Sequence, residues 1–196
     1  MALRKKIPIR SLMAAKTVYS AYKQDLRQDF SRRCGYCDAS DEFFGGFRGY
    51  QIDHFAPKSK FPEWLLRYDN LVYSCPFCNR AKSNKWVGED KSVPNDGSNG
   101  FVDPCDPEFD NHLDRDSHGR ILPKTDLGRF IVHNINLSLI RHQLVWQTQK
   151  MDDLLGELIE IQSQLNSDTE HYRAVLEEIA RVAQAYREYR RNAFEA

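Results

Sequence analysis

The sequence predicts an α+β fold built around a small ββα unit that carries a four-cysteine zinc site. Two CxxC pairs, Cys34–Cys37 and Cys75–Cys78, enclose 37 residues that contain two short strand-like segments. Apolar residues recur with helical spacing before the first pair and again near the C-terminus. We therefore expect an N-terminal helix, the zinc-bearing core and a C-terminal α-helical hairpin.

Charge is distributed unevenly along the 196 residues, although the formal net charge is zero. Residues 1–33 contain nine lysines and arginines and two aspartates, a local net charge of +7. Residues 152–196 contain ten acidic residues and five arginines, a local net charge of −5. This asymmetry is typical of a basic face directed at phosphate and an acidic, solvated end, and ordinary solvated helix faces explain it equally well.

The cysteines indicate metal binding in a reducing compartment. No apolar run is long enough to span a membrane and no signal-peptide core follows Met1, so we expect a cytoplasmic protein without a membrane partner. In that compartment, paired CxxC motifs favour metal over disulfides. Cys105 is left over and is most simply a small buried residue.

Four segments follow from these patterns. The N-terminal segment, 1–33, combines an extended basic arm over 1–16 with a helix from Thr17 to about Arg33, and we expect the arm to become ordered on contact with a partner. The third is rich in turn-forming residues and is expected to wrap back on the core. The segments are the N-terminal arm and helix at 1–33, the zinc-stabilised core at 34–87, the loop-rich wrap at 88–126, and the C-terminal helical region at 127–196.

The core reads as strand, loop, strand and helix. Tyr50–His54 alternates as a strand that stops before Pro57, and Asn70–Ser74 is a second strand. Pro76 suits the first turn of a helix over about Pro76–Lys85. Such a ββα unit is too small to bury its own core, so a zinc staple is expected on physical grounds.

The C-terminal region predicts two amphipathic helices. Apolar residues step by three and four, the break at 166–168 precedes a second run, and Ser167 with Glu170 forms a capping-box pattern. An antiparallel hairpin is the simplest arrangement, and its main rival is a surface that docks a regulatory or targeting protein. The apolar positions are Leu154, Leu158, Ile161 and Leu165, then Val175, Ile179, Val182, Tyr186 and Tyr189.

The four paired cysteines predict a closed tetrahedral zinc site. Four soft thiolates leave no coordination position for water, so this zinc would hold the shape of the core and perform no chemistry. Buried unpaired thiols are the alternative. A redox role is weaker, since neither CxxC lies in a βαβ context.

A second, catalytic metal is suggested by Asp53 and Asn79. A hard carboxylate and an amide carbonyl, with the remaining positions left to water and phosphate, suit Mg²⁺ or Mn²⁺. His54 points to the opposite side of an extended strand from Asp53 and is suited to act as a general base. Taken alone, such an Asp-His pair is more often a strand-end hydrogen bond.

The stretch resembles the HNH endonucleases, whose ββα-metal motif reads as a DH pair, a central Asn and a final CxxC followed by His or Asn. Asp53-His54, Asn70-Leu71 and Cys75–Asn79 match it in order. The resemblance implies a metal-dependent DNA endonuclease in which Asp53 and Asn79 bind the divalent metal and His54 activates water. Asn70 would fix the ββ loop and so orient His54. Asn79 stands where many relatives have His, as in HNN-type members.

The implied reaction is phosphodiester hydrolysis, with Arg80, Lys82 and Lys85 holding flanking phosphates. Solvated helix surface is an equally good account of each of these three. Two other functions remain: a non-catalytic, zinc-stabilised module that binds nucleic acid or a partner, and an RNA-cleaving nuclease. Residues 101–104 and 128–129 are more loosely similar to bacterial HNH proteins of mobile elements or defence systems.

Overall fold

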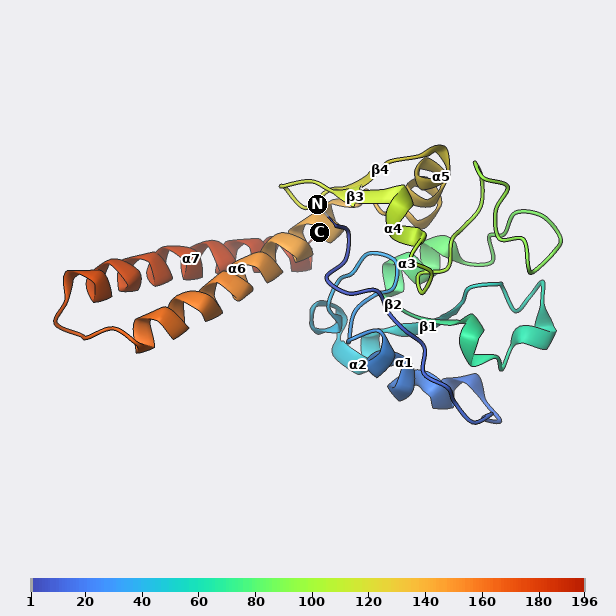
Figure 1. Ribbon diagram of the computed structural model, residues 1–196, viewed down its shortest axis with the longest axis horizontal. Coiled ribbons are helices and arrows are strands. Elements are labelled where there is room, and N and C mark those ends of the chain that lie inside the picture. The colour runs from blue at the N-terminus through green and yellow to red at the C-terminus, as the bar shows by residue number, and fades with distance from the viewer. Residues whose placement is uncertain (1, 196) are drawn as a thin grey trace. The chain divides into compact units, whose positions relative to one another are not determined.

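The computed structural model describes residues 2–195, and the chain divides into two compact units between Leu139 and Ile140. Figure 1 shows the helices and strands, which are mixed as the sequence predicted. No helix within residues 2–195 combines the length and the apolar sequence needed to cross a membrane. Besides the elements described below, the first unit contains the short helix α2 (Gly46–Gly49). It also contains 3-10 turns at Asp41–Phe44, Pro62–Trp64 and Tyr68–Asn70.

The predicted ββα unit is confirmed. Strands β1 (Gln51–His54) and β2 (Leu71–Ser74) pair antiparallel, with Asp53 opposite Val72 and His54 opposite Leu71. Helix α3 (Pro76–Lys82) follows at once and packs against β1. It ends earlier than the predicted Lys85, because Ser83 adopts a positive φ of 49° that cannot continue a helix.

The N-terminal helix is shorter than predicted over 17–33. A 3-10 turn at Tyr19–Tyr22 leads into α1 (Lys23–Asp29), which packs against β2. Leu26 is buried as its apolar spacing predicted, but Val18 is 54% exposed and lies outside the packed stripe. Tyr19 is therefore the first residue of the 3-10 turn and lies before α1 rather than inside it.

The basic arm before this helix packs on the first unit. Arg4 forms an ion pair with Asp110, and Arg10 forms one with Asp103 at 2.9 Å while donating a hydrogen bond to the Leu71 carbonyl oxygen. The charges of these two arginines are therefore neutralised within the chain. This differs from the expected arm that becomes ordered only on contact with a partner.

The wrap contains a small hairpin that the sequence did not predict. Helix α4 (Phe109–His112) precedes β3 (Leu113–Arg115), which pairs antiparallel with β4 (Ile121–Pro123). The buried Arg115 donates a hydrogen bond of 2.8 Å to the Cys37 carbonyl oxygen. This hydrogen bond joins the hairpin to the first CxxC loop. The segment at 88–126 therefore contacts the core, as expected for a segment that wraps back on it.

Helix α5 (Asp126–Ile135) begins at Thr125, whose hydroxyl caps it by accepting from the Gly128 amide, and it lies in the first unit. The first unit therefore includes the first helix of the predicted C-terminal helical region, 127–196. A Cβ atom on Gly128 would lie 2.1 Å from the His112 carbonyl oxygen. Gly128, one of the residues loosely similar to bacterial HNH proteins, is thus needed for the close packing of α5 against His112.

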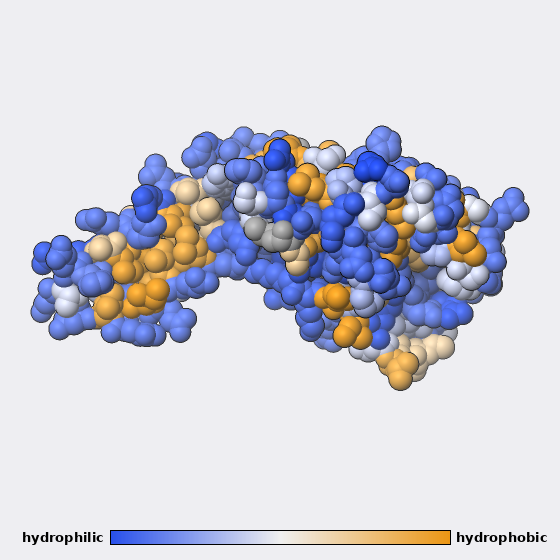
Figure 2. Space-filling view, turned by 45° about the horizontal axis from the view of Figure 1, so that its top comes forward, coloured by the Kyte–Doolittle hydropathy of each residue, from blue (hydrophilic) through white to orange (hydrophobic). Residues whose placement is uncertain are grey.

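The second unit is a helical hairpin of α6 (Ile140–Ser163) and α7 (Glu170–Glu195), which pack along each other. The Thr169 hydroxyl, rather than the predicted Ser167, accepts from the Tyr172 amide and caps α7. Figure 2 shows apolar surface along this hairpin, and its exposed members include Leu154, Ile159, Ile161 and Leu176. A protein partner for this surface stays a prediction.

Candidate metal-dependent nuclease site

The four paired cysteines meet in the core of the first unit. Their Sγ atoms all lie within 4.8 Å of one another, and those of Cys37 and Cys75 are 3.9 Å apart. Tetrahedral zinc with Zn–S bonds of about 2.3 Å needs Sγ atoms about 3.8 Å apart. Disulfide sulfurs would be only about 2.05 Å apart. The cluster therefore fits a closed structural zinc site, as predicted.

Close packing explains the glycine of the first CxxC loop. Gly35 has no positive φ, and in this loop the positive φ falls on Asp38, at 59°. A Cβ atom on Gly35 would lie 2.7 Å from Phe30 and 2.9 Å from Val72. Glycine is thus required because the zinc loop lies directly against α1 and β2.

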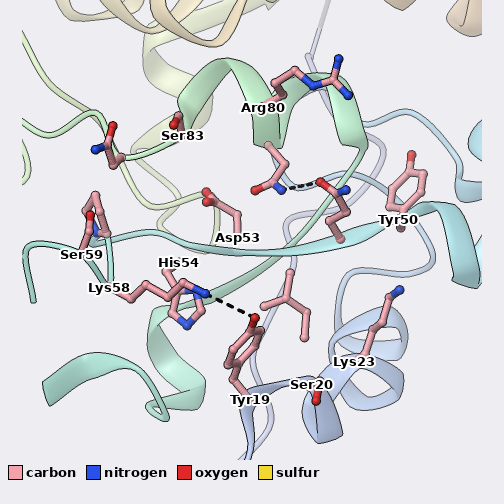
Figure 3. Close-up of a pocket in the computed structure, with 15 residues that line it drawn as sticks. Tyr19, Ser20, Lys23, Tyr50, Asp53, His54, Lys58, Ser59, Arg80 and Ser83 are labelled. Atoms are coloured by element: carbon pink, nitrogen blue, oxygen red, sulfur yellow. Dashed lines mark hydrogen bonds between the residues drawn. The ribbon is translucent and has the colours of Figure 1, made fainter. Parts of the chain in front are cut away.

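One open pocket of about 710 Å³ runs along β1, and most of the residues predicted for catalysis and for the catalytic metal line it. Asp53, His54, Asn79 and Arg80 line it, and Asn70, Lys82 and Lys85 do not. Among residues 2–195 strand β1 pairs with β2 alone, so its other edge is open to pairing. In Figure 3 Asp53 lies on the side of Arg80 and Ser83, and His54 lies on the side of Tyr19. The two side chains alternate as predicted, and the open edge lets a single pocket reach both.

Asp53 is held by two donors that approach the same oxygen. Its Oδ2 accepts a 2.6 Å hydrogen bond from the Tyr36 hydroxyl and lies 3.3 Å from the Lys82 ammonium. Burial raises the pKa of Asp53, while the Lys82 charge and the Tyr36 hydrogen bond oppose that rise. Within residues 2–195, Oδ1 has no hydrogen-bond partner. The free oxygen can serve as a metal ligand.

Lys82 does not contact phosphate at the surface, so this prediction is wrong. Its side chain is 0% exposed, and its ammonium donates a 3.1 Å hydrogen bond to the His54 carbonyl oxygen besides pairing with Asp53. Helical spacing placed Lys82 next to Arg80 on a short helix, but only the packing of α3 on β1 shows which side faces inward. Lys82 therefore fixes the backbone at the Asp53-His54 pair.

Removing the Lys82 charge should destabilise the protein strongly. We expect Lys82→Met to lower the free energy of unfolding by about 3 kcal/mol, because it leaves the Asp53 carboxylate buried without its cation. Chemical denaturation of the zinc-loaded protein, without added Mg²⁺ or Mn²⁺, measures this loss. Arg80→Met, on the exposed side of the same helix, should change stability by less than about 0.5 kcal/mol. Equal stability of the two variants would contradict the structural role of Lys82.

The His54 ring is oriented by a backbone carbonyl. Its Nε2 lies 3.0 Å from the Leu65 oxygen. Because a carbonyl only accepts, Nε2 carries the proton and the neutral ring keeps its lone pair on Nδ1. Burial lowers the pKa of His54, so the imidazole is neutral near pH 7. A neutral imidazole bordering an open pocket has the chemistry of a general base.

Asn70 fixes the chain directly after His54. Its side chain accepts a 2.8 Å hydrogen bond from the Ala56 amide and donates one of 3.0 Å to the Ala56 carbonyl oxygen. It is 1% exposed and makes a further hydrogen bond to the Trp64 carbonyl oxygen. These bonds close the loop between β1 and β2, which supports the expected positioning role of Asn70.

Asn79, on α3, has the chemistry of the second expected metal ligand. Its amide nitrogen donates to the Gln51 Oε1 atom, so its carbonyl oxygen is left as an acceptor. Together with Asp53 Oδ1 it offers two hard oxygens bordering one pocket, a donor set suited to Mg²⁺ or Mn²⁺. Among the described residues, Asp53 is the one acidic residue that lines this pocket. The remaining positions would fall to water and phosphate.

The other two predicted phosphate contacts lie in different surroundings. Arg80 is exposed and lines the pocket. Lys85 follows the end of α3 and donates a 2.8 Å hydrogen bond to the Asn134 carbonyl oxygen of α5, away from the pocket lining. Arg80 is therefore the better placed of the two for a phosphate.

Sequence reasoning missed three residues that contact the site. Tyr36 lies inside the first CxxC and reaches Asp53, while Tyr19 and Lys58 border His54 and its pocket. Two of them had a signal in the sequence. Tyr36 stands between two predicted zinc ligands, and Lys58 stands just after Pro57 in the ββ loop. Tyr19 had no local signal, because it approaches only through the fold.

These features define a ββα unit with a four-cysteine cluster suited to zinc and with a carboxylate, an imidazole and an amide around one open pocket. The model of the HNH endonuclease family matches residues 34–85, about a quarter of the chain, so this segment is similar to an HNH endonuclease domain. The match includes all four paired cysteines, Asp53, His54, Asn70 and Asn79. Searches of curated proteins and of solved structures found no match.

Proposed function

We propose that this protein is a metal-dependent endonuclease that hydrolyses DNA phosphodiester bonds. The observation that carries the proposal is the neutral His54 ring, oriented through Nε2 by Leu65 and bordering the same pocket as Asp53 and Asn79. The match to the HNH family supports the same reaction class.

In this mechanism His54 Nδ1 accepts a proton from the attacking water, and Leu65 keeps the ring in the required tautomer. Arg80 and Lys58 supply positive charge at the edge of the pocket for flanking phosphates. A divalent ion held by Asp53 and Asn79 would neutralise charge that develops on the phosphate and the leaving oxygen. The zinc of the cysteine cluster would hold these residues in place.

Incubation of the purified chain with plasmid DNA and Mg²⁺ or Mn²⁺ tests the proposal. We expect nicked or linear DNA with either ion, none in EDTA, and no cleavage of a matched RNA. Cleavage of the RNA alone would replace DNA by RNA as the substrate. Binding of DNA without cleavage under every metal condition would favour a non-catalytic binding module.

A further inference from the structure

The 3-10 turn before α1 reaches the HNH pocket from outside the matched segment. Tyr19 belongs to this turn, whereas the family match begins at Cys34. Its ring centroid lies 4.8 Å from that of His54, with the planes at 75° in an edge-to-face arrangement. Figure 3 shows Tyr19 beside His54, on the side of the strand opposite Asp53. An element remote in sequence thus contacts the proposed general base.

Lys58 also contacts Tyr19. The Lys58 ammonium lies 4.6 Å from the ring centroid and donates a 3.3 Å hydrogen bond to the hydroxyl. Lys58 belongs to the loop that Asn70 and the β1–β2 pairing keep in place. The aromatic ring therefore contacts both the base, at the end of β1, and a cation of the loop that follows it.

A hydrogen bond restrains the His54 ring at one atom, Nε2, and the ring can still rotate about that hydrogen bond. The Leu65 carbonyl fixes Nε2, but a single hydrogen bond does not fix the plane of the ring. Contact with Tyr19 supplies the missing restraint, since an edge-to-face pair prefers a narrow range of orientations. The two contacts together determine where Nδ1 points.

We propose that Tyr19 is a positioning residue for the nuclease reaction, contributed by the N-terminal segment, which holds the His54 imidazole in its reactive orientation. The inference rests on the proposed function for its kinetic consequence. It also has a consequence for the ring itself that does not depend on cleavage.

Three variants test this role. Tyr19→Ala should lower kcat for DNA cleavage by about 10- to 100-fold with KM nearly unchanged, because the base is misplaced while the phosphate contacts remain. Tyr19→Phe keeps the ring contact and should retain near wild-type kcat. Val18→Ala, an exposed neighbour outside the pocket, is the control and should behave as wild type. Zinc content and melting temperature show that each variant is folded.

Nitrogen-15 spectra of the His54 ring provide the readout that is independent of activity. Wild type and Tyr19→Phe should show a single His54 ring environment, whereas Tyr19→Ala, in which Leu65 still fixes the tautomer, should show ring signals broadened by exchange among several orientations. Wild-type kcat in Tyr19→Ala, failure of Tyr19→Phe to preserve kcat, or an unchanged ring spectrum in Tyr19→Ala would each overturn the proposal. If wild type itself cleaves nothing, the nuclease proposal fails and the ring spectra still decide whether Tyr19 orients His54.

Discussion

Removal of zinc should unfold the core that carries the proposed nuclease site. The four thiolates join the loop after α1 to the start of α3, where Cys75 also caps the helix by accepting from the Cys78 amide. Structural zinc contributes about 10–16 kcal/mol of apparent binding free energy in zinc-finger peptides, comparable with the whole stability of about 5–15 kcal/mol of a typical domain. The first unit therefore has little stability to spare without the ion.

Cys75→Ser is the variant that tests this expectation. It should lose bound zinc, measured by elemental analysis against one equivalent per wild-type chain, and hydrogen-exchange protection across residues 34–85. Cys105→Ser is the matched control, because Cys105 lies outside the cluster. Retention of protection in zinc-free Cys75→Ser would show that the sulfur cluster is dispensable for the fold.

Replacement of His54 should nearly abolish cleavage while DNA binding persists. A positioned general base contributes about 10²- to 10⁴-fold to rate, so His54→Ala should lower kcat by that factor. Binding should change little, since the exposed cations Lys58 and Arg80 remain at the pocket. Plasmid nicking and fluorescence-anisotropy binding on the same protein preparations measure the two effects separately.

His133→Ala is the control for this experiment. His133 is an exposed histidine of α5 outside the pocket lining, so its loss should leave kcat unchanged. Nicking by His54→Ala at the wild-type rate would exclude His54 as the base. A parallel loss in both variants would indicate a general effect on the protein rather than on the reaction.

The parts of the fold that local sequence determines were predicted well. Strands β1 and β2 lie where two short strands were predicted, and the start of α3 follows from Pro76 after a cysteine. The C-terminal hairpin follows from apolar spacing. The hairpin of β3 and β4 was missed because each strand is only three residues long and Arg115 is buried through contacts distant in sequence.

The candidate site divides in the same way. The HNH motif identified Asp53, His54 and Asn79, which line one pocket, and Asn70, which closes the adjoining loop. The inward orientation of Lys82 depends on how α3 packs on β1, and the contact of Tyr19 depends on where the N-terminal turn lies. Such contacts arise from tertiary packing, so neither periodicity nor motif spacing could predict them.

A crystal soaked with Mn²⁺ tests the central claim most directly, because anomalous scattering locates the ion without reference to activity. The account predicts manganese bound by Asp53 Oδ1 and the side-chain oxygen of Asn79, on the opposite side of β1 from the His54 ring. Manganese bound elsewhere in the first unit, or none at this pocket at saturating concentration, would contradict it.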